Sequence, residues 1–81
     1  SLHDALPIYE VKLSIMKELV RRKFTDKHLK QLLINTNDYE LIEGNTWGDT
    51  YWGVCNGNGE NHLGKILMET RKEIKKESDI T

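Results

Sequence analysis

Length, composition and charge limit this chain to a small globular domain. Its 81 residues suffice for one domain with a modest core, because short chains bury a smaller share of their apolar surface. Twelve basic and thirteen acidic residues nearly cancel, so no strong field selects nucleic acid or an anionic membrane. The single cysteine, Cys55, allows no intrachain disulfide, and no apolar run approaches the roughly 18 residues of a membrane span. We therefore expect a cytoplasmic protein without cofactor, metal site or disulfide partner.

Residues 1–8 do not share the pattern of the sequence that follows them. They show no periodic spacing of apolar residues that continues into the next segment. A nucleotide string that resembles the end of a common sequencing adapter encodes this octapeptide in one reading frame. We therefore interpret residues 1–8 as a non-native segment joined to a truncated gene, and such segments are left out of fold reasoning. The alternative is a genuine N-terminal arm. The rest divides into a domain segment at residues 9–77 and a frayed tail at residues 78–81.

Two amphipathic helices are predicted in the first half of the chain. Between Tyr9 and Phe24, apolar residues recur every three to four positions and charged residues fill the other face. Thr25 then offers a hydroxyl N-cap, and Asp26 a negative charge for the first turn, of a shorter helix. The polar run at 35–38 ends that helix. Its apolar stripe consists of Leu29, Leu32 and Leu33.

Short β segments and a third helix are expected in the second half. Residues 39–43 alternate in part and predict a short strand, which Gly44 and Asn45 break. Residues 46–54 are aromatic but interrupted by glycines, so they form either an irregular segment or a second short strand. Asn61 is placed to cap the last helix. The buried stripe of that helix would be Leu63, Ile66, Leu67, Thr70 and Ile74.

The stretch from Asn45 to Arg71 carries the candidate chemistry. A glycine- and asparagine-rich loop that includes Asn58 and Gly59 stands directly before the third helix. Free backbone N–H groups and the positive end of the helix dipole there favour an anion such as phosphate, although most such loops only turn the chain. Gly64, one turn into the helix, would let a ligand or a neighbouring backbone approach closely.

Aromatic and acidic residues gather just ahead of this loop. Trp47 and Trp52 either pack in the core, as tryptophan usually does in small proteins, or stack on a planar base. In the second case Glu43 and Asp49 would face a sugar, and two carboxylates flanking a glycosidic bond are the usual equipment for its hydrolysis. The structural alternatives are an exposed strand-end acid for Glu43 and a turn-forming side chain for Asp49.

The order and spacing of these motifs resemble the NADAR family, the YbiA-like N-glycosidases, over nearly all of the chain after Ile8. The most discriminating combination is Asp-x-x-Trp-Gly, starting at Asp49, followed by Gly-x-Asn-x-Leu-Gly, starting at Gly59. The resemblance implies a helix-rich α+β domain with a truncated YbiA-like fold. Further matches are Lys23-Phe24, Leu32-Leu33, Thr36, Glu43, Leu67-Met68 and Arg71.

The resemblance also implies a reaction and roles for the matched residues. The reaction would be hydrolysis of a phosphorylated ribose N-glycoside, either a ribosylaminopyrimidine phosphate of riboflavin synthesis or an ADP-ribosylated guanine. Glu43 and Asp49 would be catalytic. Substrate-binding residues would be Trp47, Trp52, Gly53, Asn58, Gly59, Asn61 and Gly64, and framework residues would be Lys23, Phe24, Leu67 and Arg71.

Family members are longer, and their N-terminal half resembles a segment with an essential glutamate that has no counterpart in this chain. We therefore expect the C-terminal half of a NADAR-type domain, inactive alone, with the missing N-terminal half of the same domain as its partner. Two alternatives remain. One is a non-catalytic module that binds ADP-ribose or a nucleotide, and the other is a helical interaction fragment in which the motif residues only pack.

Overall fold

Three helices and one two-stranded sheet make up residues 7–80, which are the residues described by the structure, a computed structural model. In chain order they are α1 (Ile8–Lys23), α2 (Lys27–Ile34), β1 (Gly44–Asn45), β2 (Val54–Cys55) and α3 (His62–Ile80). This arrangement confirms the helix-rich α+β class. Of the segment interpreted as non-native, only Pro7 and Ile8 lie within the described residues, and Ile8 begins α1.

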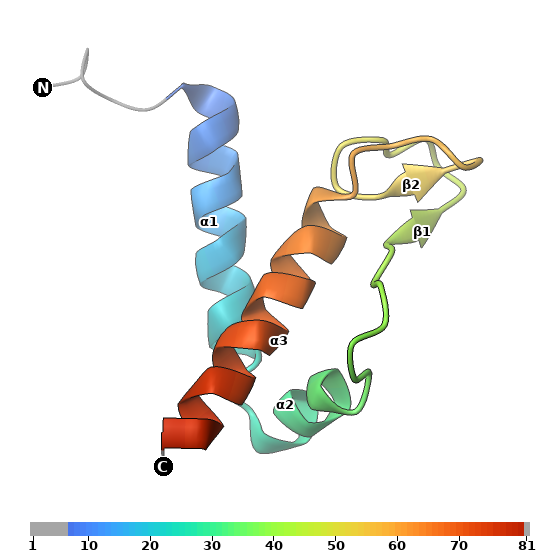
Figure 1. Ribbon diagram of the computed structural model, residues 1–81. Helices are drawn as coiled ribbons and strands as arrows, with labels where there is room; N and C mark the ends of the chain where they lie inside the picture. The colour runs from blue at the N-terminus through green and yellow to red at the C-terminus, as the bar shows by residue number, and fades with distance from the viewer. Residues whose placement is uncertain (1–6, 81) are drawn as a thin grey trace, which may run out of the picture.

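α3 is the element against which both other helices pack (Figure 1). Lys17 lies 3.9 Å from Glu69, and Arg21 lies 2.9 Å from Glu73. Both partners advance by four residues in the same direction, so α1 and α3 run parallel. The hydrogen bond from Arg21 to Glu73, together with the charge of that carboxylate, raises the pKa of Arg21. The buried apolar side chains of the three helices form the core; they are Val20, Leu33, Ile66 and Ile74.

The N-cap of α2 is Asp26, so the prediction of Thr25 in this role was wrong. Asp26 Oδ1 accepts a hydrogen bond from the Leu29 N–H at 2.9 Å, as an N-cap side chain does. The Thr25 hydroxyl instead donates to the carbonyl of Arg22 at 2.7 Å, at the end of α1. α2 therefore begins one residue later than the cap prediction assumed.

The predicted strand at residues 39–43 does not form, and the two residues expected to break it, Gly44 and Asn45, are β1. β1 pairs in parallel with β2, with Gly44 opposite Val54 and Asn45 opposite Cys55. Within residues 39–43 only Glu43 bonds β2, through its carbonyl and the Val54 N–H. Leu41 instead points its N–H to the Met68 sulfur of α3, at 3.5 Å. A neighbouring strand, more than local β-propensity, decides which residues pair.

α3 buries much of the predicted stripe and two further residues. Ile66, Thr70 and Ile74 are buried, and so are Gly64 and Arg71, which the apolar pattern did not select. Leu63 and Leu67 are half-buried. The helix continues to Ile80, past Glu77, where fraying was expected. No helix within residues 7–80 has the length and apolar character needed to cross a bilayer.

Candidate active site

Asn45 closes the loop that carries the first candidate acid. Its Oδ1 accepts a hydrogen bond from the Asp49 N–H at 3.0 Å, and its Nδ2 donates to the Asp49 carbonyl at 2.8 Å. A weaker bond of 3.4 Å runs from the same Nδ2 to the Val54 carbonyl in β2. Gly48 makes the turn with φ of 84°, a conformation that favours glycine. The residue expected to interrupt a strand is therefore the organiser of the loop.

One carboxylate oxygen of Asp49 is fixed by the backbone that follows it. Asp49 Oδ1 accepts hydrogen bonds from the N–H groups of Tyr51 at 3.0 Å and Trp52 at 2.9 Å. The turn-forming alternative thus describes this oxygen correctly. The side chain is half-buried, and its second oxygen accepts no hydrogen bond from residues 7–80. Asp49 therefore presents an oriented carboxylate with one oxygen available.

Glu43, the second candidate acid, is positioned through its backbone. Its N–H donates to Asn61 Oδ1 at 2.9 Å, and its carbonyl accepts from the Val54 N–H at 2.8 Å. The residue is half-buried and immediately precedes β1, so it is neither exposed nor at the end of a strand. Its carboxylate makes no hydrogen bond or ion pair with the described part of the chain. Both candidate acids thus flank β1, one directly before it and one in the loop after it.

All three predicted pocket glycines lie where backbones meet closely. A Cβ on Gly53 would overlap the Glu43 carbonyl, and one on Gly59 would overlap the Gly53 carbonyl. A Cβ on Gly64 would overlap the Leu41 carbonyl and the Asn61 side chain. Close approach of a neighbouring backbone therefore accounts for these glycines, and a role in binding substrate stays a prediction.

The start of α3 offers fewer free donors than the anion prediction assumed. Four consecutive N–H groups donate to four consecutive carbonyls of the preceding loop, at 2.8–3.3 Å: Glu60 to Thr50, His62 to Tyr51, Leu63 to Trp52 and Asn61 to Gly53. The Asn61 side chain does not cap the helix either, since it bonds the backbone of Leu41 and Glu43. The N–H and carbonyl of Asn58 bond those of Cys55 in a tight turn.

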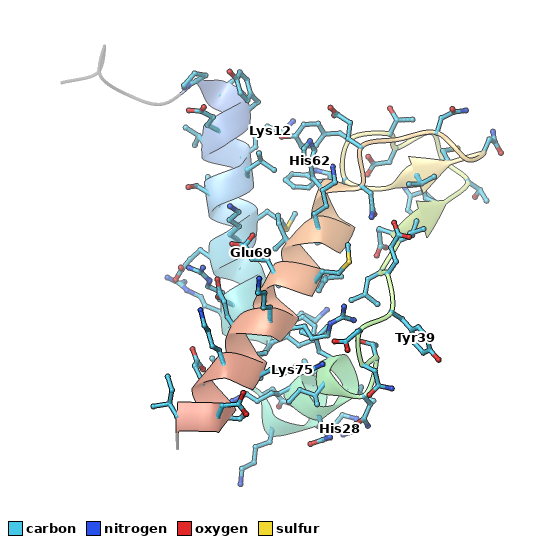
Figure 2. The ribbon with its side chains drawn as sticks, in the orientation of Figure 1. Lys12, His28, Tyr39, His62, Glu69 and Lys75 are labelled. Atoms are coloured by element: carbon cyan, nitrogen blue, oxygen red, sulfur yellow. The ribbon has the colours of Figure 1, made fainter. Side chains whose placement is uncertain are left out.

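An aromatic cluster joins this loop to the two long helices. Tyr51 packs edge-on against Trp52, with ring centroids 4.8 Å apart, and tilts over His62 at 4.5 Å. Lys12 of α1 places its ammonium 4.1 Å from the centre of the Tyr51 ring, and Figure 2 shows Lys12 and His62 near each other at this end of the molecule. Trp52 is thus packed, whereas Trp47 is 74% exposed on the loop.

Lys12, Asn45 and His62 are contributors that the sequence prediction missed. In the sequence, Lys12 is one of several cations on the polar face of a predicted helix. The aromatic ring that it contacts, that of Tyr51, lies about forty residues away. No local sequence pattern predicts such a contact. Cys55 is a free, half-buried thiol, and no group of three His, Cys, Asp or Glu side chains within residues 7–80 is arranged to hold a metal ion.

Comparison with known proteins places this architecture in a family. The NADAR domain matches residues 8–75. The chain is 46% identical over 68 residues to the N-glycosidase Npun_R5314 of Nostoc punctiforme, which covers 80% of this chain and 42% of that protein. It is 40% identical over 67 residues to the N-glycosidase YbiA of Escherichia coli K12, covering 79% and 41% respectively.

A plant relative extends the comparison. The chain is 36% identical over 74 residues to the chloroplastic riboflavin biosynthesis protein PYRR of Arabidopsis thaliana, covering 89% of this chain and 12% of that protein. No solved structure gives a significant match. The chain spans about two fifths of the length of the N-glycosidases it matches. The matched residues 8–75 contain every candidate site residue. The expected resemblance is confirmed, and the chain belongs to the NADAR domain family.

Proposed function

We propose that this chain forms one wall of an N-glycosidase pocket that hydrolyses a phosphorylated ribose N-glycoside. The observation that carries the proposal is the Asp49 carboxylate, whose Oδ1 is held by two backbone N–H groups while its other oxygen accepts no hydrogen bond from the described residues. A carboxylate that is already held in one orientation can stabilise the positive charge that develops on the sugar in the transition state, without first having to reorient. The relatives named N-glycosidase support the reaction class.

Asp49 and Glu43 divide the acid and base work of this reaction. One carboxylate stabilises the oxocarbenium-like sugar or activates water, and the other protonates the leaving base. Asn45 holds the loop of Asp49, and Asn61 holds the backbone of Glu43, so both acids are positioned by buried or half-buried amide side chains. Trp47, exposed on the loop between β1 and Asp49, offers a ring on which the base stacks.

The first substrate to test is a ribosylaminopyrimidine phosphate. Two relatives carry riboflavin biosynthesis in their names, the plant protein PYRR and VVA0006 of Vibrio vulnificus, which is 38% identical over 68 residues. An ADP-ribosylated guanine is the second substrate. Both contain a phosphorylated ribose joined to a planar base through an N-glycosidic bond.

The test is a chimera in which residues 8–75 of this chain replace the matching segment of E. coli YbiA. The chimera and the 81-residue chain are each incubated with both substrates, and the free base is measured by chromatography. We expect release by the chimera and little or none by the chain alone. A folded chimera that binds either substrate without releasing base would favour a non-catalytic binding module. A folded chimera that neither binds nor hydrolyses would remove both functions.

A further inference from the structure

Arg71 of α3 is a buried cation without an acidic partner among residues 7–80. Its exposed fraction is 6%, and its Nη1 donates to the hydroxyl of Thr36 at 2.8 Å. The guanidinium makes no ion pair and no second hydrogen bond within residues 7–80. A guanidinium carries five N–H donors and stays charged at physiological pH, and a buried charge is costly unless it is paired. Arg71 therefore has further N–H donors that could bind an anion.

Arg71 lines a pocket at the surface of the molecule. The pocket has a volume of about 340 Å³ and is lined by Asp38, Met68, Arg71, Lys72 and Lys75. Every side-chain nitrogen or oxygen that is fully shielded from solvent within the described residues has a hydrogen-bond partner. The Arg71 nitrogens that lack a partner among residues 7–80 are consequently reached by solvent, and Arg71 lines this pocket.

The charges around this pocket are unbalanced. Lys75, on the later half of α3 (Figure 2), donates to Asp38 at 3.2 Å and to the Asn37 carbonyl at 3.3 Å. Asp38, the one acid that lines the pocket, is thereby paired with Lys75. Arg71 and Lys72 keep their positive charges without a carboxylate among residues 7–80. A small anion with two negative charges would balance them.

We propose that this pocket binds a phosphoryl group, with Arg71 as its main ligand and Lys72 as the second. The planar guanidinium presents paired N–H donors that match phosphate oxygens, and ammonium groups add point charges. The group comes from inorganic phosphate or from a small sugar phosphate. Arg71 thus acts as more than the framework residue that the family resemblance implied.

This pocket is separate from the start of α3, where phosphate was first expected. Arg71 follows Asn61 by ten residues, which along a helix is a rise of about 15 Å. Met68, which lines the pocket, contacts the N–H of Leu41. One lining residue of the pocket thus contacts the 39–43 segment, which ends at Glu43. The proposal does not rest on N-glycosidase activity.

The test is an NMR titration of the 81-residue chain, following backbone amides at constant ionic strength set with chloride. One arm uses inorganic phosphate and the other uses ribose 5-phosphate. We expect saturable shifts centred on Arg71 and Lys72. A tighter fit to ribose 5-phosphate would identify a sugar phosphate as the source, and equal affinity would identify free phosphate. Absence of saturable shifts in both arms would overturn the proposal.

Matched variants show whether the pocket itself binds. Lys72→Met and Lys76→Met remove the same charge from exposed positions of α3, but only Lys72 lines the pocket. We expect Lys72→Met to weaken binding about two- to fivefold, Lys76→Met to leave it unchanged, and Arg71→Met to abolish it. Equal weakening by both lysine variants would indicate a diffuse charge effect and overturn the proposal. Neither the titration nor the variant comparison measures turnover. A negative result in either would therefore leave the proposed hydrolysis untouched.

Discussion

The side chain of Asn61 holds the backbone of Glu43. Asn61 Oδ1 accepts from the Glu43 N–H, and Nδ2 donates to the Leu41 carbonyl, both at 2.9 Å. Asn61 is 8% exposed and has φ of 55°, a left-handed conformation that asparagine adopts more readily than most residues. The residue that precedes α3 thus fixes the segment that carries a candidate catalytic acid.

Replacing Asn61 by alanine should lower the free energy of unfolding by about 1–3 kcal/mol, because a half-buried donor and a half-buried acceptor on the 41–43 segment lose their partners. Asn56→Ala is the matched control. Asn56 also has a positive φ, of 51°, but it is exposed, and its side chain makes no hydrogen bond within the described residues. Urea unfolding followed by tryptophan fluorescence measures both. Equal losses would mean that backbone strain, and not the two hydrogen bonds, accounts for the effect.

Gly64→Ala should destabilise the chain, although alanine normally favours a helix over glycine by about 1 kcal/mol. The added methyl would overlap the Leu41 carbonyl and the Asn61 side chain, and overpacking of this kind costs about 1–3 kcal/mol. Gly44→Ala is the control, since a Cβ there meets nothing within 4 Å. Thermal unfolding of both variants checks the prediction. A Gly64→Ala variant as stable as the parent would show that α3 and the 41–43 segment are not packed as closely as the structure has them.

The helices could be predicted from sequence because their signal is local. Apolar spacing within α1 and α3 is set by residues three and four apart, and α1 ends within one residue of its predicted end, whereas α3 continues past Glu77 to Ile80. The strands have no such signal. Gly44 and Asn45 have low β-propensity, and they form β1 only because Val54 and Cys55 lie beside them.

The sequence selected candidate site residues, whose role in a site stays a prediction, but not their geometry. Family motifs pointed to Asp49, Gly53, Asn61 and Gly64, but several of these serve the backbone. Asn61, expected as a helix cap, holds a segment about twenty residues away in sequence. An asparagine side chain bonds whichever backbone groups the fold brings near it, so its partners follow from tertiary structure and not from its neighbours in sequence.

Lys12→Met should weaken the contact between α1 and the aromatic cluster. The ammonium lies 4.1 Å from the centre of the Tyr51 ring, and an exposed cation–π contact contributes about 0.5–1 kcal/mol. A double-mutant cycle with Tyr51→Leu isolates this contribution from the packing that each residue makes elsewhere. Unfolding free energies of the four proteins provide the coupling energy. A coupling of zero would show that Lys12 and Tyr51 lie close without stabilising each other.

Asp49→Asn separates the structural role of this side chain from its chemical one. The amide oxygen of asparagine still accepts the N–H groups of Tyr51 and Trp52, so the loop should keep its shape while the negative charge is lost. In the chimera with E. coli YbiA, we expect turnover to fall by about 100- to 10,000-fold, with a much smaller change in substrate affinity. Glu40→Gln is the control, because Glu40 is an exposed acid near Glu43 that belongs to no candidate site. Base release measures turnover, and urea unfolding checks that both variants are folded. Unchanged turnover in a folded Asp49→Asn chimera would limit Asp49 to shaping the loop and would leave Glu43 as the candidate acid to test.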